Sequence, residues 1–182
     1  VLVEDGMLMI GFALMIVGLG FKIAAFPFHS WTPDAYQGAP TPVVVWMAAG
    51  VKVAGFAALI RVFPLTFASY VDDWQIPIAV LAGLTVVFGS VVAVVQSDVK
   101  RMLAYSSIAH AGFILLGVQS ANTDGVASVL FYLAIYTFLA SGSFAVLTVV
   151  GGDGDLNHDI TAYKGLAQRK PVLAILFTVL LL

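Results

Sequence analysis

The sequence contains no cysteine, and only 10% of its 182 residues are charged. The absence of cysteine excludes disulfide bonds, thiolate metal sites and cysteine nucleophiles. A soluble domain carries about 25% charged residues, so this chain has too few charges to cover a water-soluble fold. The eight lysines and arginines are scattered along the chain, and this excludes the basic face of a nucleic-acid-binding protein.

Hydrophobic residues make up 61% of the chain, and its mean hydropathy is +1.03. They fall into runs at about 6–36 (broken at Pro27), 42–63, 75–95, 100–118 and 125–150, with an incomplete run at 171–182. A helix needs about 20 apolar residues to cross the hydrocarbon core, and open sheet edges cannot face lipid. The sequence therefore predicts a single all-α, multi-spanning transmembrane domain over residues 1–182.

The charges between these runs predict an orientation in the membrane. One side carries five basic residues, namely Lys100, Arg101, Lys164, Arg169 and Lys170, and the other carries only Arg61. Because basic loops stay in the cytoplasm, we expect residues 151–170 to form a cytoplasmic loop and residue 1 to lie outside. We expect Lys100 and Arg101 to be solvated. Since the sequence starts at a valine and stops inside an apolar run, we also expect an internal piece of a longer protein.

Lys52 lies in the middle of the run 42–63, about 15 Å from either end of a helix. A charged residue at this depth costs about 2.5–3.5 kcal/mol on insertion scales, and such residues usually serve ion or proton movement. The alternative is a structural lysine that is paired with a carboxylate on another helix.

Lys22 precedes Pro27, which cannot donate a backbone hydrogen bond and therefore breaks the helix beside the lysine. Broken helices at membrane depth usually line polar cavities, so we expect a functional site here. A kink that only aids packing is the alternative.

Three further polar features accompany the lysines. His110 lies on the helical face of Ser106 and Ser107, which predicts either a proton relay or a packed histidine. The stretch after the break contains His29, Pro33 and Asp34. Two potential ligands do not make a metal site, so we expect His29 and Asp34 to cap and orient the broken segment. Trp31 and Tyr36 fit an interfacial aromatic belt.

Four stretches of the sequence resemble the antiporter-like membrane subunits of bacterial respiratory complex I, the proton-translocating NADH-quinone oxidoreductase. They are FKIAAFPFHSWTPDAYQGAPTPVVVWMAAGVKVAGFAALIRVF, SDVKRMLAYSSIAHAGFILLGV, FYLAIYTFLASGSFAV and ITAYKGLAQRKP. The wording PFHSWTPDAYQGAPTPV favours the subunit N type over the sister subunits M and L.

This resemblance implies inverted helical repeats, each with one discontinuous helix. Lys22 matches the lysine of a discontinuous helix, Lys52 the lysine of the next helix, and His110 a polar position on the hydrophilic axis. The family's acidic partner and a second broken-helix lysine fall outside the chain. The implied function is proton transport along this Lys/His axis in the bacterial inner membrane, coupled to quinone reduction elsewhere in the complex.

The resemblance also implies partners and cofactors. We expect contacts with the lipid bilayer and with other complex I membrane subunits, including sister antiporter-like subunits. The sequence has no glycine-rich dinucleotide fingerprint and no cysteine for iron–sulfur clusters. No cofactor or metal is therefore expected in this chain, while NADH, FMN, iron–sulfur clusters and quinone would belong to partner subunits.

Three other functions remain open at this point. An Mrp-type cation/proton antiporter subunit would use the same lysines. A non-pumping structural subunit would pair its lysines permanently with carboxylates. An intramembrane hydrolase built on His29 and Asp34 would lack a credible nucleophile or third metal ligand.

Overall fold

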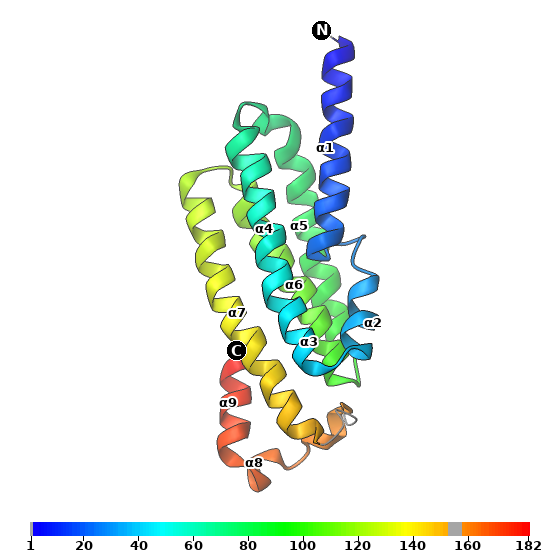
Figure 1. Ribbon diagram of the computed structural model, residues 1–182, viewed down its shortest axis with the longest axis vertical. Coiled ribbons are helices and arrows are strands. Elements are labelled where there is room, and N and C mark those ends of the chain that lie inside the picture. Colours follow the sequence, from blue (N-terminus) through cyan, green and yellow to red (C-terminus); the bar gives the residue numbers. More distant parts are fainter. Residues whose placement is uncertain (1, 153–157) are drawn as a thin grey trace.

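The computed structural model describes residues 2–152 and 158–182. Its α-helices are α1 (Leu2–Ile23), α2 (Trp31–Gly38), α3 (Thr41–Trp46), α4 (Lys52–Ile60), α5 (Val71–Val94), α6 (Val99–Gln119), α7 (Thr123–Gly151), α8 (Leu166–Arg169) and α9 (Pro171–Leu181). The described residues also form four segments of π- or 3-10 helix, namely η1 (Met47–Val51), η2 (Arg61–Thr66), η3 (Ala68–Tyr70) and η4 (Ile160–Tyr163). The described residues form no β-strand, so the predicted all-α fold is confirmed (Figure 1).

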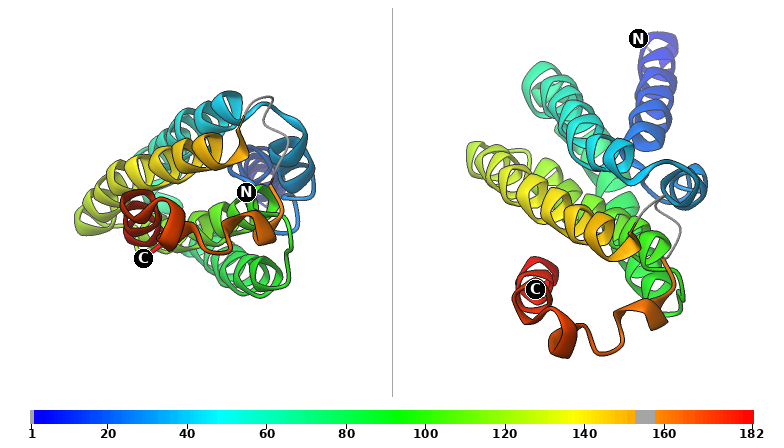
Figure 2. Two further views of the ribbon diagram at one scale, coloured as in Figure 1. Left: turned by 90° about the horizontal axis from the view of Figure 1, so that it is seen from below. Right: turned by 60° about the horizontal axis from the view of Figure 1, so that its bottom comes forward.

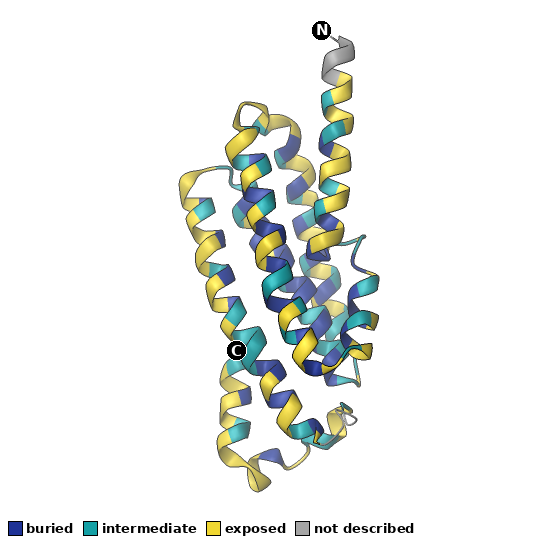
Figure 3. Cartoon of the chain, viewed as in Figure 1, coloured by how far each residue is buried: buried dark blue, intermediate teal, exposed yellow. Residues whose placement is uncertain are grey.

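Five helical stretches within the described residues are long and apolar enough to cross a membrane. They are Gly6–Ile23, Thr41–Thr66, Ala68–Val94, Val99–Gln119 and Thr123–Gly151. Large apolar side chains remain exposed on these stretches. Figure 3 shows that exposed positions run along the outer faces of the helices. Lipid tails or neighbouring helices must cover these faces, because both are apolar surroundings in which such side chains are stable. The predicted multi-spanning membrane architecture is therefore confirmed.

The predicted break in the first helix is present. α1 ends at Ile23 and α2 begins at Trp31, with residues 24–30 forming a non-α connection that contains Pro27. Two hydrogen bonds, one across the break and one from α5, satisfy backbone groups beside it. The indole N–H of Trp31 donates to the carbonyl of Phe21 over 3.1 Å. The backbone N–H of Phe26 donates to the Thr85 hydroxyl on α5 over 3.0 Å.

The second span contains two segments with a wider helical winding. Residues Thr41–Thr66 are continuous, but the segments η1 and η2 are wound as wider π-helices. The first wide segment ends at Val51, directly before Lys52. π-Helical turns are rare and are often found at functional sites.

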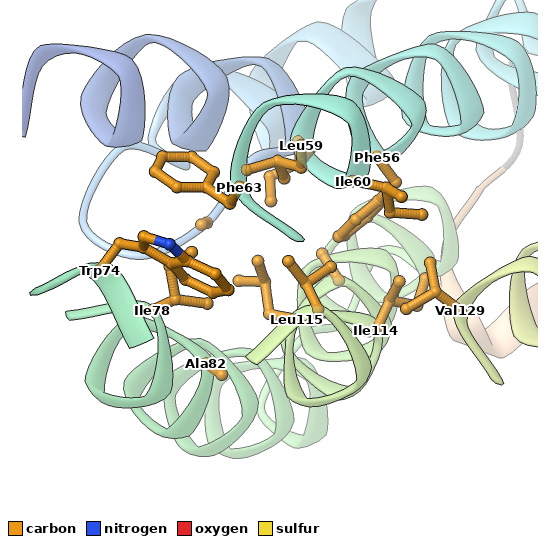
Figure 4. Packing of buried hydrophobic residues seen from close by; sticks show 14 of the residues in the cluster. Phe56, Leu59, Ile60, Phe63, Trp74, Ile78, Ala82, Ile114, Leu115 and Val129 are labelled. Atoms are coloured by element: carbon orange, nitrogen blue, oxygen red, sulfur yellow. The ribbon is translucent and has the colours of Figure 1, made fainter. Parts of the chain in front are cut away.

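The helices α5 and α6 form the closest pair in the bundle because glycines remove side chains from their contact. A Cβ atom on Gly89 would lie only 2.6 Å from the backbone nitrogen of Ala109, and one on Gly112 only 2.7 Å from that of Val86. Small residues allow membrane helices to approach in this way. Figure 4 shows the core that continues from this contact, including Phe56 on α4.

The two basic connections lie at the same end of the bundle. The backbone N–H of Val99 donates to the His158 carbonyl over 2.8 Å, and that of Ile160 donates to the Ser97 carbonyl over 2.9 Å. Figure 2 shows this end, where the α5–α6 connection approaches the segment that leads to α8. Residues 153–157 of the predicted cytoplasmic loop 151–170 lie outside the described residues.

Candidate functional site

Lys52 forms the centre of the candidate site. Its side chain is only 2% exposed, and its ammonium donates to the Ser107 hydroxyl over 2.6 Å and also to the Ser107 carbonyl. The nitrogen lies 5.4 Å from the ring centroid of Tyr136 on α7, a cation–π contact. Among the described residues, no carboxylate pairs with this lysine. A buried cation held only by neutral groups is costly, and in membranes it usually marks a functional site.

Ser107 joins three helices at this site. Its hydroxyl lies 2.6 Å from the Tyr136 hydroxyl as well as from the Lys52 nitrogen. Tyr36, on the second half of the broken helix, also contacts the Ser107 hydroxyl. Hydroxyl groups both donate and accept, so a serine between a lysine and two tyrosines can pass a proton in either direction.

His110 lies one helical turn after Ser107 and continues the same polar face. Its Nδ1 atom is 2.8 Å from the Tyr132 hydroxyl, and its ring centroid is 5.2 Å from that of Tyr136. The tyrosines Tyr132 and Tyr136 are four residues apart on α7, so they lie on one face of that helix. The structure therefore joins Lys52 and His110 through a continuous group of hydroxyls and rings.

A small cavity of about 60 Å³ opens beside this group. Its polar lining comes from Ser106, Ser107, His110, Tyr136 and Ser143, and the remaining lining is apolar. A cavity needs about 10–15 Å³ of such volume to hold one water, together with polar partners. The site therefore has room for a few waters next to the serine and the histidine.

Lys22 lies apart from this group in the described chain. It belongs to the last turn of α1 and is exposed, and no hydrogen bond or ion pair of its side chain is found among the described residues. Its Cγ atom would lie 3.6 Å from a Cβ on Gly55, which follows Lys52 by three residues on α4. Lys22 on α1 therefore lies beside the turn of α4 that follows Lys52, but of the two lysines only Lys52 is enclosed.

Comparisons with known proteins show the family of the chain. The sequence profile of the family described as NADH:quinone oxidoreductase/Mrp antiporter, TM, matches residues 1–182. The chain belongs to this family. It is 48% identical to NADH-quinone oxidoreductase subunit N of Trichlorobacter lovleyi over 97% of the chain, and 51% identical to that of Parafrankia sp. over 98%. The chain spans about a third of these curated relatives, 36% and 34% of their lengths.

Solved structures support the same membership. The chain is similar to a chain of respiratory complex I from Thermus thermophilus with bound aureothin, with a TM-score of 0.73 and 40% identity. That match covers 92% of this chain and 36% of the other. A chain of the membrane-bound sulfane sulfur reductase, an archaeal respiratory membrane complex, matches with a TM-score of 0.82, 32% identity and coverage of 94% and 35%. The family and the apolar spans place the chain in the bacterial inner membrane.

The residues after the break do not act as a capping pair. His29 is 8% exposed and lies between the rings of Phe26 and Phe88, at centroid distances of 5.4 and 4.5 Å. Asp34 points to the surface and accepts from Arg101, while α2 begins after Ser30 without a side-chain cap. The capping part of the prediction for His29 and Asp34 is therefore wrong, whereas Asp34 does tie α2 to α6 through Arg101. Among the described residues, no group of three or more potential ligands could hold a metal.

Pro33 occupies the first turn of α2 and is buried. A proline is tolerated there because the N–H groups of the first turn have no partner within the helix. Tyr36, three residues later, does not form the interfacial belt that the sequence predicts. It is 1% exposed and faces Ser107, because α2 packs against α6 rather than toward lipid.

Lys100 is the second residue whose surroundings differ from the prediction. The sequence predicts a solvated lysine, but the side chain is 2% exposed. Its ammonium donates to the Ala39 carbonyl over 2.8 Å and lies 3.5 Å from Nε2 of His158. Burial follows in part from residues 158–160, which pair with residues 97–99 at the start of α6. Its partners are about sixty residues away along the chain, so no local sequence signal could have identified them.

Proposed function

We propose that this chain forms part of the membrane subunit of a proton-translocating NADH:quinone oxidoreductase. Its role is to carry protons along the Lys52–Ser107–His110 axis. One observation carries the proposal, namely the buried Lys52 ammonium that is held by the Ser107 hydroxyl and carbonyl without a carboxylate. The names of the curated relatives support the same assignment.

The geometry suggests how a proton passes through the site. Burial in a low-dielectric interior disfavours the charged form of Lys52, and this favours transfer of a proton from its ammonium to a neighbouring acceptor. The Ser107 and Tyr136 hydroxyls lie 2.6 Å apart and can relay it by accepting one proton and donating another. Waters in the adjoining cavity would bridge the remaining gap to His110. The bond between Nδ1 of His110 and Tyr132 fixes the orientation of the imidazole.

Lys22 is proposed to act as the switching residue that loads this axis. Its exposed side chain lies beside Gly55, so another part of the full-length protein must cover it in the membrane. The family resemblance implies that an acidic residue outside this chain provides that cover. Movement of that carboxylate toward or away from Lys22 would favour its charged or its neutral form.

The proposed partners follow from the same assignment. Other membrane subunits, including sister antiporter-like subunits, would pack against the exposed apolar faces of the bundle. NADH, FMN, iron–sulfur clusters and quinone would be bound by partner subunits, while this chain handles only protons.

Specific observations count against two alternative functions. A structural lysine would be paired with a carboxylate, whereas the described partners of Lys52 are neutral. An Mrp-type antiporter shares the family and the lysines, but the curated relatives cited above are named as oxidoreductase subunits.

The test is Lys22→Ala in the full-length subunit within the assembled complex. We expect proton uptake into inverted vesicles driven by NADH to fall sharply at an unchanged amount of complex. Normal proton translocation with normal assembly would defeat the proposal. Uptake of radioactive sodium in place of protons by the unmodified complex would favour the antiporter alternative.

A further inference from the structure

The helix α2, the second half of the broken helix, brings Tyr36 into the site, but α2 is too short to be stable by itself. α2 has only eight residues, and isolated helices of this length are unstable in water. It nevertheless places the buried Tyr36 on the Ser107 hydroxyl, with its ring 6.0 Å from that of Phe144. The position of Tyr36 must therefore be fixed by contacts that α2 makes with other elements.

A closed ring of polar contacts links α2 to the first turn of α6. The Arg101 guanidinium donates to Asp34 over 2.5 Å and to the Gln37 side-chain carbonyl over 3.0 Å. The Gln37 amide donates to Asp98 over 3.2 Å. The other Asp98 oxygen accepts the backbone N–H of Arg101 over 2.8 Å and caps α6. Arg101, Gln37 and Asp98 thus close the ring, and Asp34 joins it through Arg101.

Lys100 holds the far end of α2 from the same turn of α6. Its ammonium donates to the carbonyl of Ala39, the C-cap residue that follows α2. A cation is favourable at this end of a helix, where the last carbonyls lack partners. Two neighbouring residues of α6 therefore hold both ends of α2, and Figure 1 shows the two helices side by side near the lower end of the bundle.

The contribution of this ring is geometric rather than energetic. The Asp34 and Arg101 side chains are 74% and 30% exposed, and exposed ion pairs contribute little to stability. However, contacts from two successive turns of α2 to one turn of α6 fix both the rotation of α2 and its position along α6. That rotation determines whether Tyr36 faces Ser107 or turns toward lipid.

We propose that the cluster of Asp34, Gln37, Asp98 and Arg101 is a positioning clamp for the broken helix, which keeps Tyr36 on the proton path. This inference rests on the proposed function of the Lys52 site. None of the four residues touches Lys52 itself, so they act through Tyr36 and Ser107.

The test uses the full-length subunit in the assembled complex and measures protons translocated per electron. The variants are Asp34→Ala, Arg101→Gln, Tyr36→Phe and the double variants that combine Tyr36→Phe with each clamp change. Asp73→Ala is the matched control, because Asp73 is also an exposed aspartate in the first turn of a helix. Asp34→Ala removes a mostly exposed side chain, so assembly is expected to survive even if Arg101→Gln reduces it.

We expect each clamp variant and Tyr36→Phe to lower the proton-to-electron ratio by at least about twofold, with Asp73→Ala unchanged. Because both changes act through one contact, a double variant should be no worse than its poorer single variant. Arg101→Lys should recover part of the loss. Clamp variants that match the control, or double variants whose losses multiply, would overturn the proposal.

Lys52→Met in the same membranes separates this proposal from the proposed function. Loss of translocation in Lys52→Met, with unchanged clamp variants, would refute the clamp alone. Normal translocation in Lys52→Met would refute the proposed function itself.

Discussion

Substitution of Gly89 by alanine tests the close contact that places α6 in the bundle. The new Cβ would lie 2.6 Å from the backbone nitrogen and 2.9 Å from the Cα of Ala109, which lies between Ser107 and His110. Backbone atoms cannot move aside as a flexible side chain can, so α5 and α6 must separate. Overpacking of this kind costs about 1–3 kcal/mol.

Gly83→Ala is the matched control on the same helix, because a Cβ at that position meets nothing within 4 Å. Replacing a helical glycine by alanine gains about 1 kcal/mol of stability in itself. We therefore expect Gly83→Ala to be about 1 kcal/mol more stable than the original protein, and Gly89→Ala to be up to about 2 kcal/mol less stable, when the overpacking cost is combined with that gain.

The assay is thermal unfolding of the full-length subunit in detergent, followed by fluorescence-detected size exclusion, with proton translocation by the assembled complex measured in parallel. Gly89→Ala should lower both the unfolding midpoint and translocation, since it displaces the helix that carries Ser107. An unfolding midpoint for Gly89→Ala at or above that of Gly83→Ala would refute the reasoning about this contact.

Two further predictions address single hydrogen bonds. Tyr132→Phe removes the 2.8 Å bond to His110 but keeps the ring, so we expect lower translocation and a loss of about 0.5–1.5 kcal/mol in stability, measured in the same two assays. At Asp159, the Thr161 hydroxyl and then the Thr161 backbone N–H hold the carboxyl pKa below its usual value. This contribution is present above the unfolded pKa and is lost as the pH falls through the folded pKa. Asp159→Asn should therefore speed hydrogen exchange of residues 160–163, relative to the original protein at the same pH, near neutral pH and have no effect in strong acid. The same ratio of variant to original exchange rates at both pH values would contradict this prediction.

The sequence predicted the general architecture because apolar run length alone determines what can cross a bilayer. The same reasoning identified Lys52 correctly as buried, since its depth in the run leaves no route to water. The helix break was also predictable, because Pro27 cannot donate a backbone hydrogen bond. These features depend on the local sequence, and the structure shows each of them.

The surroundings of the site depend on contacts between distant segments, which local sequence patterns do not reveal. Lys100 looked solvated because it follows a polar turn, yet Ala39 and His158 enclose it from two other parts of the chain. Tyr36 looked interfacial because it follows Trp31 in a polar stretch, but the packing of α2 on α6 turns it inward. Tyr136 gave no signal at all, since one tyrosine in an apolar helix usually serves packing.

The central claim is that Lys52 transfers protons. Its most direct test is the number of protons translocated per NADH oxidised by assembled complex that carries Lys52→Met, a variant that keeps the side-chain length but cannot be charged. Lys170→Met is the control, because Lys170 is exposed at the end of the bundle. We expect Lys52→Met to lose most of this ratio while Lys170→Met keeps it. An unchanged ratio in correctly assembled Lys52→Met complex would contradict the account.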